Sequence, residues 1–182
     1  MKLSEPSDSD IKFIHSSLNK QFPTIPFQKI LTNYTLLSTN KKEYFILSSN
    51  MAREYSNLKN IDKYLRHIGI YFGRTRKEFG LALESLDFIV QNITNDILVE
   101  NSIRLTSSES KKFLYGKSQS IKKNKFKNDS IDILEKKKLI LDELGDVIGI
   151  GIIKVIKEVL ELHPIVDLGQ YLRSENTGMF GK

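Results

Sequence analysis

The first apolar residues of the chain recur at helical spacing, at Ile11, Ile14, Leu18 and Phe22. Residues three and four apart share one face of an α-helix, so this spacing predicts an amphipathic helix. Ser9 or Asp10 can cap its N-terminus, and Pro23 and Pro26 end it.

Shorter apolar stretches follow, separated by turn-type residues such as Thr39-Asn40. The expected elements are strands over 33–37 and 43–47, a helix over 48–58, a strand over 64–72 ended by Gly73, a strand over 79–83 and a short helix over 84–90. Helix and strand alternate, which indicates an α/β unit of about ninety residues.

The polar segment 91–95 is the expected domain boundary, dividing the chain into residues 1–93 and 94–182. Beyond it, the expected strands are 97–99, 118–126, 131–141, 147–153 and 155–162, with one helix after Thr106 and another near 166–173. Several short strands with turns between them are typical of a small barrel. The predicted fold class is α+β, an N-terminal α/β domain followed by a small β-barrel with short helices.

The helix after Thr106 has the clearest local signals in the chain. Thr106 and Glu109 form the S/T-x-x-E pattern, in which each side chain satisfies a free backbone N–H of the other residue. Gly116 stands where a glycine ends a helix in the left-handed conformation. Both ends of this helix are therefore predicted from sequence.

Composition excludes several classes of protein. The 182 residues include no cysteine, so disulfides and thiolate metal sites are absent. The longest run of apolar residues and glycine, 147–153, is far shorter than the roughly 20 residues that span a bilayer. The N-terminal residues are polar and lack the apolar core of a signal peptide. We therefore expect a cytoplasmic protein with no membrane partner. We also expect it to be a monomer.

Positive charge is gathered in two segments of a chain whose net charge is +6. Residues 110–128 contain seven lysines and no acidic residue, and 63–77 hold five basic side chains around Tyr71 and Phe72. A lysine run can be only a solvated face, but its start at the end of a capped helix favours a binding surface. Aromatic rings between cations can stack on bases, although core packing is the competing interpretation for both rings.

If the strand after Gly116 continues, alternate residues from Ser118 to Asn124 share one face, with Ile121 among those opposite. That face would present small hydroxyls and lysines, which suit a phosphate backbone. We expect Lys117, Lys122, Lys123 and Lys125 to contact phosphates.

No motif of a known catalytic centre is present. His15, His67 and His163 stand in different expected elements without metal-ligand spacing, so surface or packing roles are favoured for them. The Gly-x-Gly at 149–151 is followed by strand-type residues, so close strand packing is favoured over nucleotide binding. No catalytic residue, metal site or cofactor is predicted.

The segment 113–116, the Gly-x-Gly at 149–151 and the late segment 167–173 together resemble a PUA domain, the small RNA-binding barrel of pseudouridine synthases and archaeosine transglycosylases. Ile68-Gly69, Phe72-Gly73 and the segment 81–87 resemble the N-terminal domain of a ribosome-biogenesis family that ends in a PUA domain. That family implies a non-catalytic factor for assembly of the large ribosomal subunit, in the cytoplasm, or in the nucleolus of a eukaryote.

The resemblance also implies a set of RNA-binding residues and a set of partners. The RNA would be pre-ribosomal, and the N-terminal domain would contact other assembly proteins. The implied RNA-binding residues are Tyr115, Gly116, Lys117, Ser118, Lys122, Lys123, Lys154 and Lys157.

Two other classes of function stay open at this point. PUA domains often accompany RNA-modifying enzymes, for which Asp62 and Asp87 of the first domain are available as a catalytic Asp, although neither lies in a recognisable motif. The basic segments could instead bind acidic proteins, which predicts salt-sensitive binding without preference for RNA over heparin.

Overall fold

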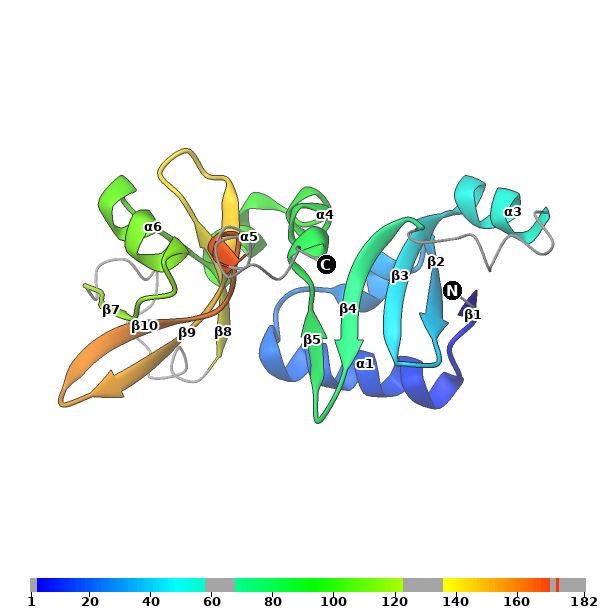
Figure 1. The fold of residues 1–182 in the computed structure, drawn as a ribbon, viewed down its shortest axis with the longest axis horizontal. Coiled ribbons are helices and arrows are strands. Elements are labelled where there is room, and N and C mark those ends of the chain that lie inside the picture. Colours follow the sequence, from blue (N-terminus) through cyan, green and yellow to red (C-terminus); the bar gives the residue numbers. More distant parts are fainter. Residues whose placement is uncertain (1–2, 58–67, 123–135, 171–172, 174–182) are drawn as a thin grey trace, which may run out of the picture. The chain divides into compact units, whose positions relative to one another are not determined.

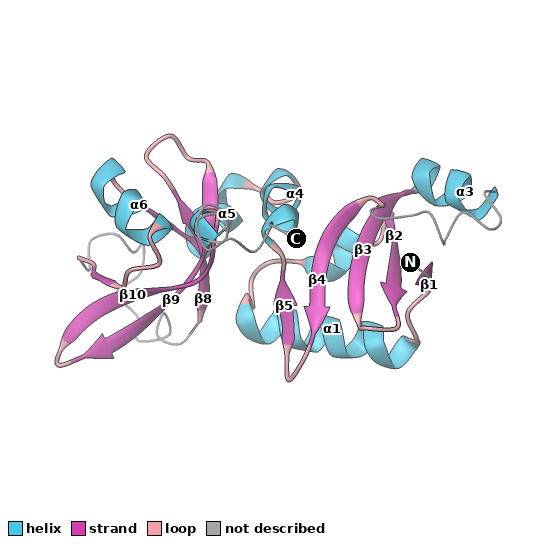
Figure 2. Cartoon of the chain, viewed as in Figure 1, coloured by secondary structure: helices cyan, strands magenta, loops and turns pink. Residues whose placement is uncertain are grey.

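The computed structural model describes residues 3–57, 68–122, 136–170 and 173. The chain forms two compact units, Met1–Ile93 and Thr94–Lys182. Each combines helices with a sheet (Figures 1 and 2), and the division falls within the polar segment between them.

The N-terminal unit is a five-stranded antiparallel sheet with helices around it (Figure 1). The strands lie in chain order across the sheet. The elements are β1 (Leu3–Ser4), α1 (Asp8–Gln21), α2 (Phe27–Leu31), β2 (Tyr34–Thr39), β3 (Glu43–Ser48), α3 (Ser49–Asn57), β4 (Ile70–Thr75), β5 (Phe79–Leu81), a 3₁₀ turn at Leu83–Ser85 and α4 (Leu86–Gln91).

Helix α1 confirms the expected apolar face, with Ile14 and Leu18 almost fully buried. Its cap is earlier than predicted, because the Ser7 hydroxyl accepts the backbone N–H of Asp10. Gln21 donates to the Phe79 carbonyl at 2.8 Å, so α1 is fastened to β5 by a buried hydrogen bond.

The predicted stop at Gly73 is wrong, because β4 continues through this residue to Thr75. Gly73 is instead a point of close approach between strands, where a Cβ would overlap the Gly80 carbonyl oxygen. Phe72 is fully buried, which confirms core packing for this ring. Residues 64–67 of the expected strand lie outside the described residues.

The C-terminal unit is a sheet curled into a half-barrel, with strand order β6-β8-β9-β10-β7 (Figure 2). Strands β6 and β8 pair in parallel, and the other neighbours are antiparallel. The elements are α5 (Asn95–Asn101), β6 (Ser102–Arg104), α6 (Ser107–Leu114), β7 (Gln119–Ser120), β8 (Lys137–Leu141), β9 (Val147–Ile156) and β10 (Val159–Asp167).

Helix α6 covers one face of this sheet and closes its core. Phe113 is fully buried and packs in one cluster with residues of the strands, namely Ile103, Ile121, Ile140, Ile148, Ile153 and Leu162. The predicted capping box is confirmed, since the Thr106 side chain accepts from Glu109 N and the Glu109 carboxylate accepts from Thr106 N. Strand β9 passes close to β10 at Gly149, where a Cβ would overlap the Val166 carbonyl oxygen and lie 2.9 Å from the Phe113 ring of α6. The strand-packing interpretation of this glycine is thereby confirmed.

The expected strand over 97–99 is wrong, because these residues belong to α5. A run of three apolar residues is too short to show a period, and the chain context decides its conformation. Asn101 donates to the Ile97 carbonyl at 2.8 Å, and Lys138 donates to the Glu100 carbonyl at 2.7 Å. Burial lowers the pKa of this lysine, whose ammonium binds the C-terminal end of the helix.

The boundary between the last two strands also differs from prediction. β9 runs to Ile156, and the chain reverses at Lys157 and Glu158, whose φ angles are +48° and +67°. Two left-handed residues in a row form the tight hairpin turn, but Lys-Glu is not a turn signal in sequence. Strand β10 then extends to Asp167, so the expected helix near 166–173 begins later, at Gly169.

Two further expected strands are shorter in the described part of the chain. β7 includes only Gln119 and Ser120 of the expected 118–126, of which 123–126 lie outside the described residues. β8 begins at Lys137, and residues 131–135 of its expected range lie outside them as well.

Candidate nucleic-acid interface

The loop from Tyr115 to Ser118 carries the chain from the end of α6 to the sheet edge at β7. Gly116 has a φ of +71°, and its N–H donates to the Phe113 carbonyl at 2.8 Å. Lys117 N donates to the Lys112 carbonyl at 3.1 Å, which completes a Schellman motif. The motif fixes the backbone of the loop and leaves the Tyr115 side chain 70% exposed.

An ion pair between the buried Asp167 and Arg173 supports the start of this loop. The Asp167 carboxylate is buried at the end of β10, and both of its oxygens accept from the Arg173 guanidinium. Arg173 also donates to the Leu114 carbonyl at the end of α6. A Cβ on Gly116 would lie 3.4 Å from this guanidinium, an ordinary van der Waals distance, so glycine is favoured here by its left-handed backbone and not by lack of space.

Residues 118–122 alternate between the two faces of the sheet, as predicted. Gln119 and Ile121 are buried on the core side, whereas Ser118, Ser120 and Lys122 are exposed. The Gln119 amide donates to the Glu109 carbonyl at 2.9 Å, which ties β7 to α6. The exposed residues therefore lie on the face opposite the core, which we call the outer face.

Strand register brings residues from distant parts of the chain into rows on the outer face. Directly paired residues of antiparallel strands project to the same side of a sheet. Ser120 pairs with Glu161, which in turn pairs with Lys154 of β9. Neighbouring strands are about 4.8 Å apart, so Ser120 and Lys154 are separated by about two such spacings.

The next row along contains Lys122. The N–H of Ile121 donates to the Leu160 carbonyl at 2.9 Å, which continues the register beyond β7 and sets Lys122 beside Val159. Lys157 lies at the hairpin turn beyond this row. The outer face thus carries Lys154 directly opposite Glu161, with Lys122 one row further along.

A third row joins Ser118, His163, Ile152 and Lys137. His163 pairs with Ile152 of β9, which pairs with Lys137 of β8. On the other side, His163 Nδ1 lies 2.8 Å from the Ser118 hydroxyl. His163 Nε2 is 3.3 Å from Glu161 Oε2, but within the described residues it has no aligned hydrogen bond. The imidazole therefore stands between the loop hydroxyl and the carboxylate.

The structure unites most of the predicted RNA-binding residues. Tyr115, Gly116, Lys117 and Ser118 form the loop at the sheet edge, and Lys122 and Lys154 share the outer face. Lys157 is further away, at the hairpin turn. Lys123 and Lys125 lie outside the described residues.

Four residues of this region were not among the predicted RNA-binding residues: Glu161, His163, Asp167 and Arg173. The contacts of His163 with Ser118 and of Arg173 with Leu114 join segments that are distant along the chain, so no local pattern reveals them. The spacing of Glu161 and His163, two residues apart on a strand, is the one available signal, because it sets both side chains on one face.

In its described part, the second basic segment, residues 63–77, is a weaker candidate for binding a nucleic acid than the outer face. Tyr71 is half-buried, its ring centroid is 5.3 Å from that of Phe45, and burial raises the pKa of its hydroxyl. Arg74 is exposed but lies opposite Glu43 in the sheet, so its charge has an acidic neighbour. The basic residues at positions 63, 66 and 67 lie outside the described part of the chain.

Family comparison identifies a PUA domain in the C-terminal unit, so the chain is a PUA-containing protein. The matching model is described as the UPF0113 PUA domain and covers residues 101–176. No curated protein matches the chain. A PUA domain suggests RNA binding, and the matched residues include the whole outer face described above.

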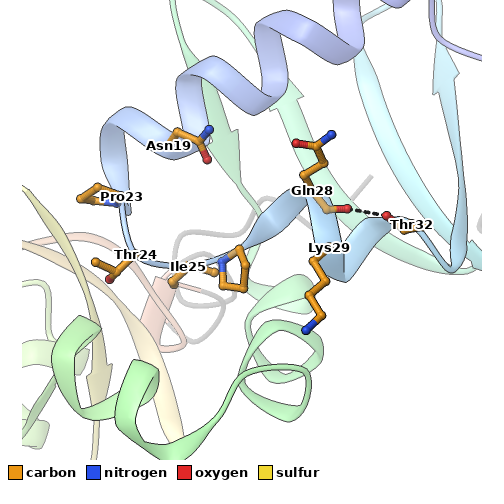
Figure 3. A pocket seen from close by; sticks show the side chains of 8 residues that line it. Asn19, Pro23, Thr24, Ile25, Gln28, Lys29 and Thr32 are labelled. Carbon is orange, nitrogen blue, oxygen red and sulfur yellow. Dashed lines mark hydrogen bonds between the residues drawn. The ribbon is translucent and has the colours of Figure 1, made fainter.

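A shallow hollow in the N-terminal unit is the other concave feature of note (Figure 3). It is lined by the end of α1, the α1–α2 connection and α2, including Asn19, Ile25 and Lys29. Thr32 donates to the Gln28 carbonyl at 2.8 Å along its wall. Among the described residues of this lining Lys29 alone is charged, so they include no acid–base pair.

The described residues form neither a candidate metal site nor a candidate membrane-spanning helix. In the ranges that the structure describes, no three His, Asp or Glu side chains are grouped to hold a metal ion. Nor does any helix there have the length and apolar character needed to cross a membrane.

Proposed function

We propose that this protein is a non-catalytic RNA-binding factor of ribosome biogenesis, acting in assembly of the large subunit. The PUA domain supports RNA binding. The resemblance of both halves of the sequence to a biogenesis family supports the assembly role. Pre-ribosomal RNA is then the ligand of the C-terminal unit, and assembly proteins are partners of the N-terminal unit.

One observation carries the proposal of RNA contact. Strand pairing sets Lys154 of β9 and Ser120 of β7 in one row, with Lys122 in the next. Cationic side chains beside small hydroxyls supply the attraction and the hydrogen-bond donors that phosphate oxygens accept. The fixed loop from Tyr115 to Lys117 extends this surface around the sheet edge.

The test measures RNA affinity against salt. Fluorescence anisotropy of a labelled RNA hairpin is recorded between about 50 and 200 mM salt, for the wild type and for the double variant Lys122→Ala/Lys154→Ala. We expect weaker binding and a flatter logarithmic salt slope, by roughly 0.7–0.9 for each phosphate that is no longer neutralised.

The matched control is Lys20→Ala/Lys29→Ala, which removes the same charge from exposed lysines of the N-terminal unit. It should leave the slope close to that of the wild type. Equal decreases in affinity for both double variants would show attraction by net charge alone and would contradict the assigned surface. Heparin in place of RNA tests the acidic-partner alternative.

The absence of catalysis and the ribosomal ligand need separate measurements. Transcripts incubated with the protein should show no modified nucleosides by mass spectrometry. Crosslinking in cells followed by sequencing should recover large-subunit precursor RNA. Enrichment of transfer RNA instead, or the appearance of a modified nucleoside, would favour an RNA-modifying role.

A further inference from the structure

The hydrogen bond between Ser118 and His163 determines what the loop can offer to an RNA phosphate. The Ser118 hydroxyl has one proton and two acceptor lone pairs. Glu161 is an acceptor when ionised, and it lies 3.3 Å from His163 Nε2, so a neutral imidazole at this position carries its proton on Nε2. Nδ1 then accepts the hydroxyl proton of Ser118 across 2.8 Å. In that state Ser118 presents lone pairs outward, and lone pairs repel a phosphate oxygen.

We propose that His163 and Ser118 form a proton-linked phosphate contact, in which protonation of the imidazole turns the Ser118 hydroxyl from acceptor to donor toward RNA. A proton on Nδ1 donates to Ser118 Oγ, and the hydroxyl proton becomes free to point outward. The imidazolium charge adds attraction for the phosphate, and Glu161 balances it on the other side.

The surroundings of His163 suit such a contact. On its own strand the facing charged group is Glu161, and from the loop before β7 the facing group is the neutral hydroxyl of Ser118. On β9 the cross-strand neighbour is the apolar Ile152, with Lys154 one row along opposite Glu161. On β8, Lys137 lies beyond Ile152 in the same row. Among these described neighbours the carboxylate is the nearest charge, so it can offset the imidazolium.

Linkage fixes the direction of the pH effect. If RNA binds the protonated form better, binding takes up a proton and affinity rises as the pH falls. Imidazole is the side chain whose charge ordinarily changes between about pH 5 and pH 8, so affinity is compared at two pH values within that range. This inference depends on the proposed function, because it concerns the same surface.

The experiment compares RNA affinity at about pH 7.5 and about pH 5.5 at fixed salt, with a labelled oligouridine. For the wild type we expect an increase of about fivefold at the lower pH, a typical coupling between two sites. Calorimetry in buffers of different ionisation enthalpy should show net proton uptake on binding. The variant His163→Asn, which keeps a donor near Ser118, should bind with no pH dependence and no proton uptake.

Two serine variants separate the hydroxyl switch from the charge alone. Ser118→Ala should lose a large part of the pH response, whereas Ser120→Ala, one row away and paired with Glu161, should keep the wild-type ratio. Equal responses in both serine variants would overturn the proposal, as would a pH response that survives in His163→Asn. Both serines are exposed, so circular dichroism should show wild-type folding.

Failure of this inference is distinguishable from failure of the proposed function. RNA binding at about pH 7.5 that depends on Lys122 and Lys154 but not on pH overturns only the proton linkage. Absence of salt-dependent RNA binding at every pH overturns both.

Discussion

Arg173 donates two hydrogen bonds to the Asp167 carboxylate in a bidentate arrangement: Nη1 is 3.0 Å from Oδ1, and Nη2 is 2.9 Å from Oδ2. The same Nη1 donates to the Leu114 carbonyl. One guanidinium therefore joins the end of β10 to the end of α6, directly beneath the loop that begins at Tyr115. The hydrogen bond with Asp167 also raises the pKa of Arg173 above its usual value.

Replacing this arginine should destabilise the C-terminal unit. Arg173→Met leaves the buried Asp167 carboxylate without this partner, and we expect a decrease of about 1–3 kcal/mol in the free energy of unfolding. Urea titration followed by circular dichroism measures it. Arg173→Lys keeps the charge but cannot form the planar double contact, so it should recover only part of the stability. Wild-type stability in the methionine variant would show that the pair contributes little.

Gly149 should tolerate no side chain. A Cβ there would overlap the Val166 carbonyl oxygen and lie 2.9 Å from Phe113, both within the packed interior. We expect Gly149→Ala to lower the free energy of unfolding by about 1–3 kcal/mol or more, the usual cost of overpacking. Gly80→Ala is the control, because its added Cβ would lie 3.9 Å from the Arg74 carbonyl oxygen, an ordinary van der Waals distance. Similar midpoints for the two variants in thermal denaturation would contradict the packing argument.

The capping box makes a local contribution that a single substitution can measure. Thr106→Ala removes the acceptor for Glu109 N and should cost about 1 kcal/mol of unfolding free energy. Ser107→Ala, one residue further along on the exposed helix surface, should change it by less than about 0.5 kcal/mol. Chemical denaturation of the two variants side by side checks the difference. A larger effect at Ser107 would reject the cap assignment.

His15 should make stability depend on pH. Burial lowers the pKa of His15 below its usual value of about 6.5, and its Nδ1 has no hydrogen bond within the described chain. The unfolded chain therefore binds the proton more readily, so stability rises with pH just below that value and is lost as the pH falls. His15→Gln should flatten this part of the profile, measured by urea unfolding at several pH values. Ser16→Ala, on the same helix, should keep the wild-type slope.

Local signals in the sequence predicted local structure well. The Thr106–Glu109 pattern, Gly116 and the alternation from Ser118 to Lys122 each involve residues a few positions apart. Their hydrogen bonds or burial form wherever that short segment is helical or extended. Both basic segments were candidates in sequence, and the start of the lysine run at a capped helix favoured the C-terminal one. The packing of Phe72 and Tyr71 into the first unit supports the same choice.

Several element boundaries were predicted wrongly because the sequence has no local signal for them. Ile97 to Val99 have strand-type side chains, but they lie in a helix whose end is bound by Lys138 from a strand some forty residues on. The turn at Lys157 and Glu158 has none of the glycine or asparagine that marks a left-handed pair. The pairing of β9 with β10 on either side of the turn sets that conformation instead.

The sequence by itself determined the elements around α6, the positive charge near them and the alternate exposure of 118–122, because these depend on neighbours within a turn or a strand. Only the tertiary structure decided that Lys154 shares a face with Ser120 and that His163 meets Ser118. Those relationships follow from strand register, and register is fixed by burying one face of the whole sheet against α6. No residue's immediate neighbours contain that information.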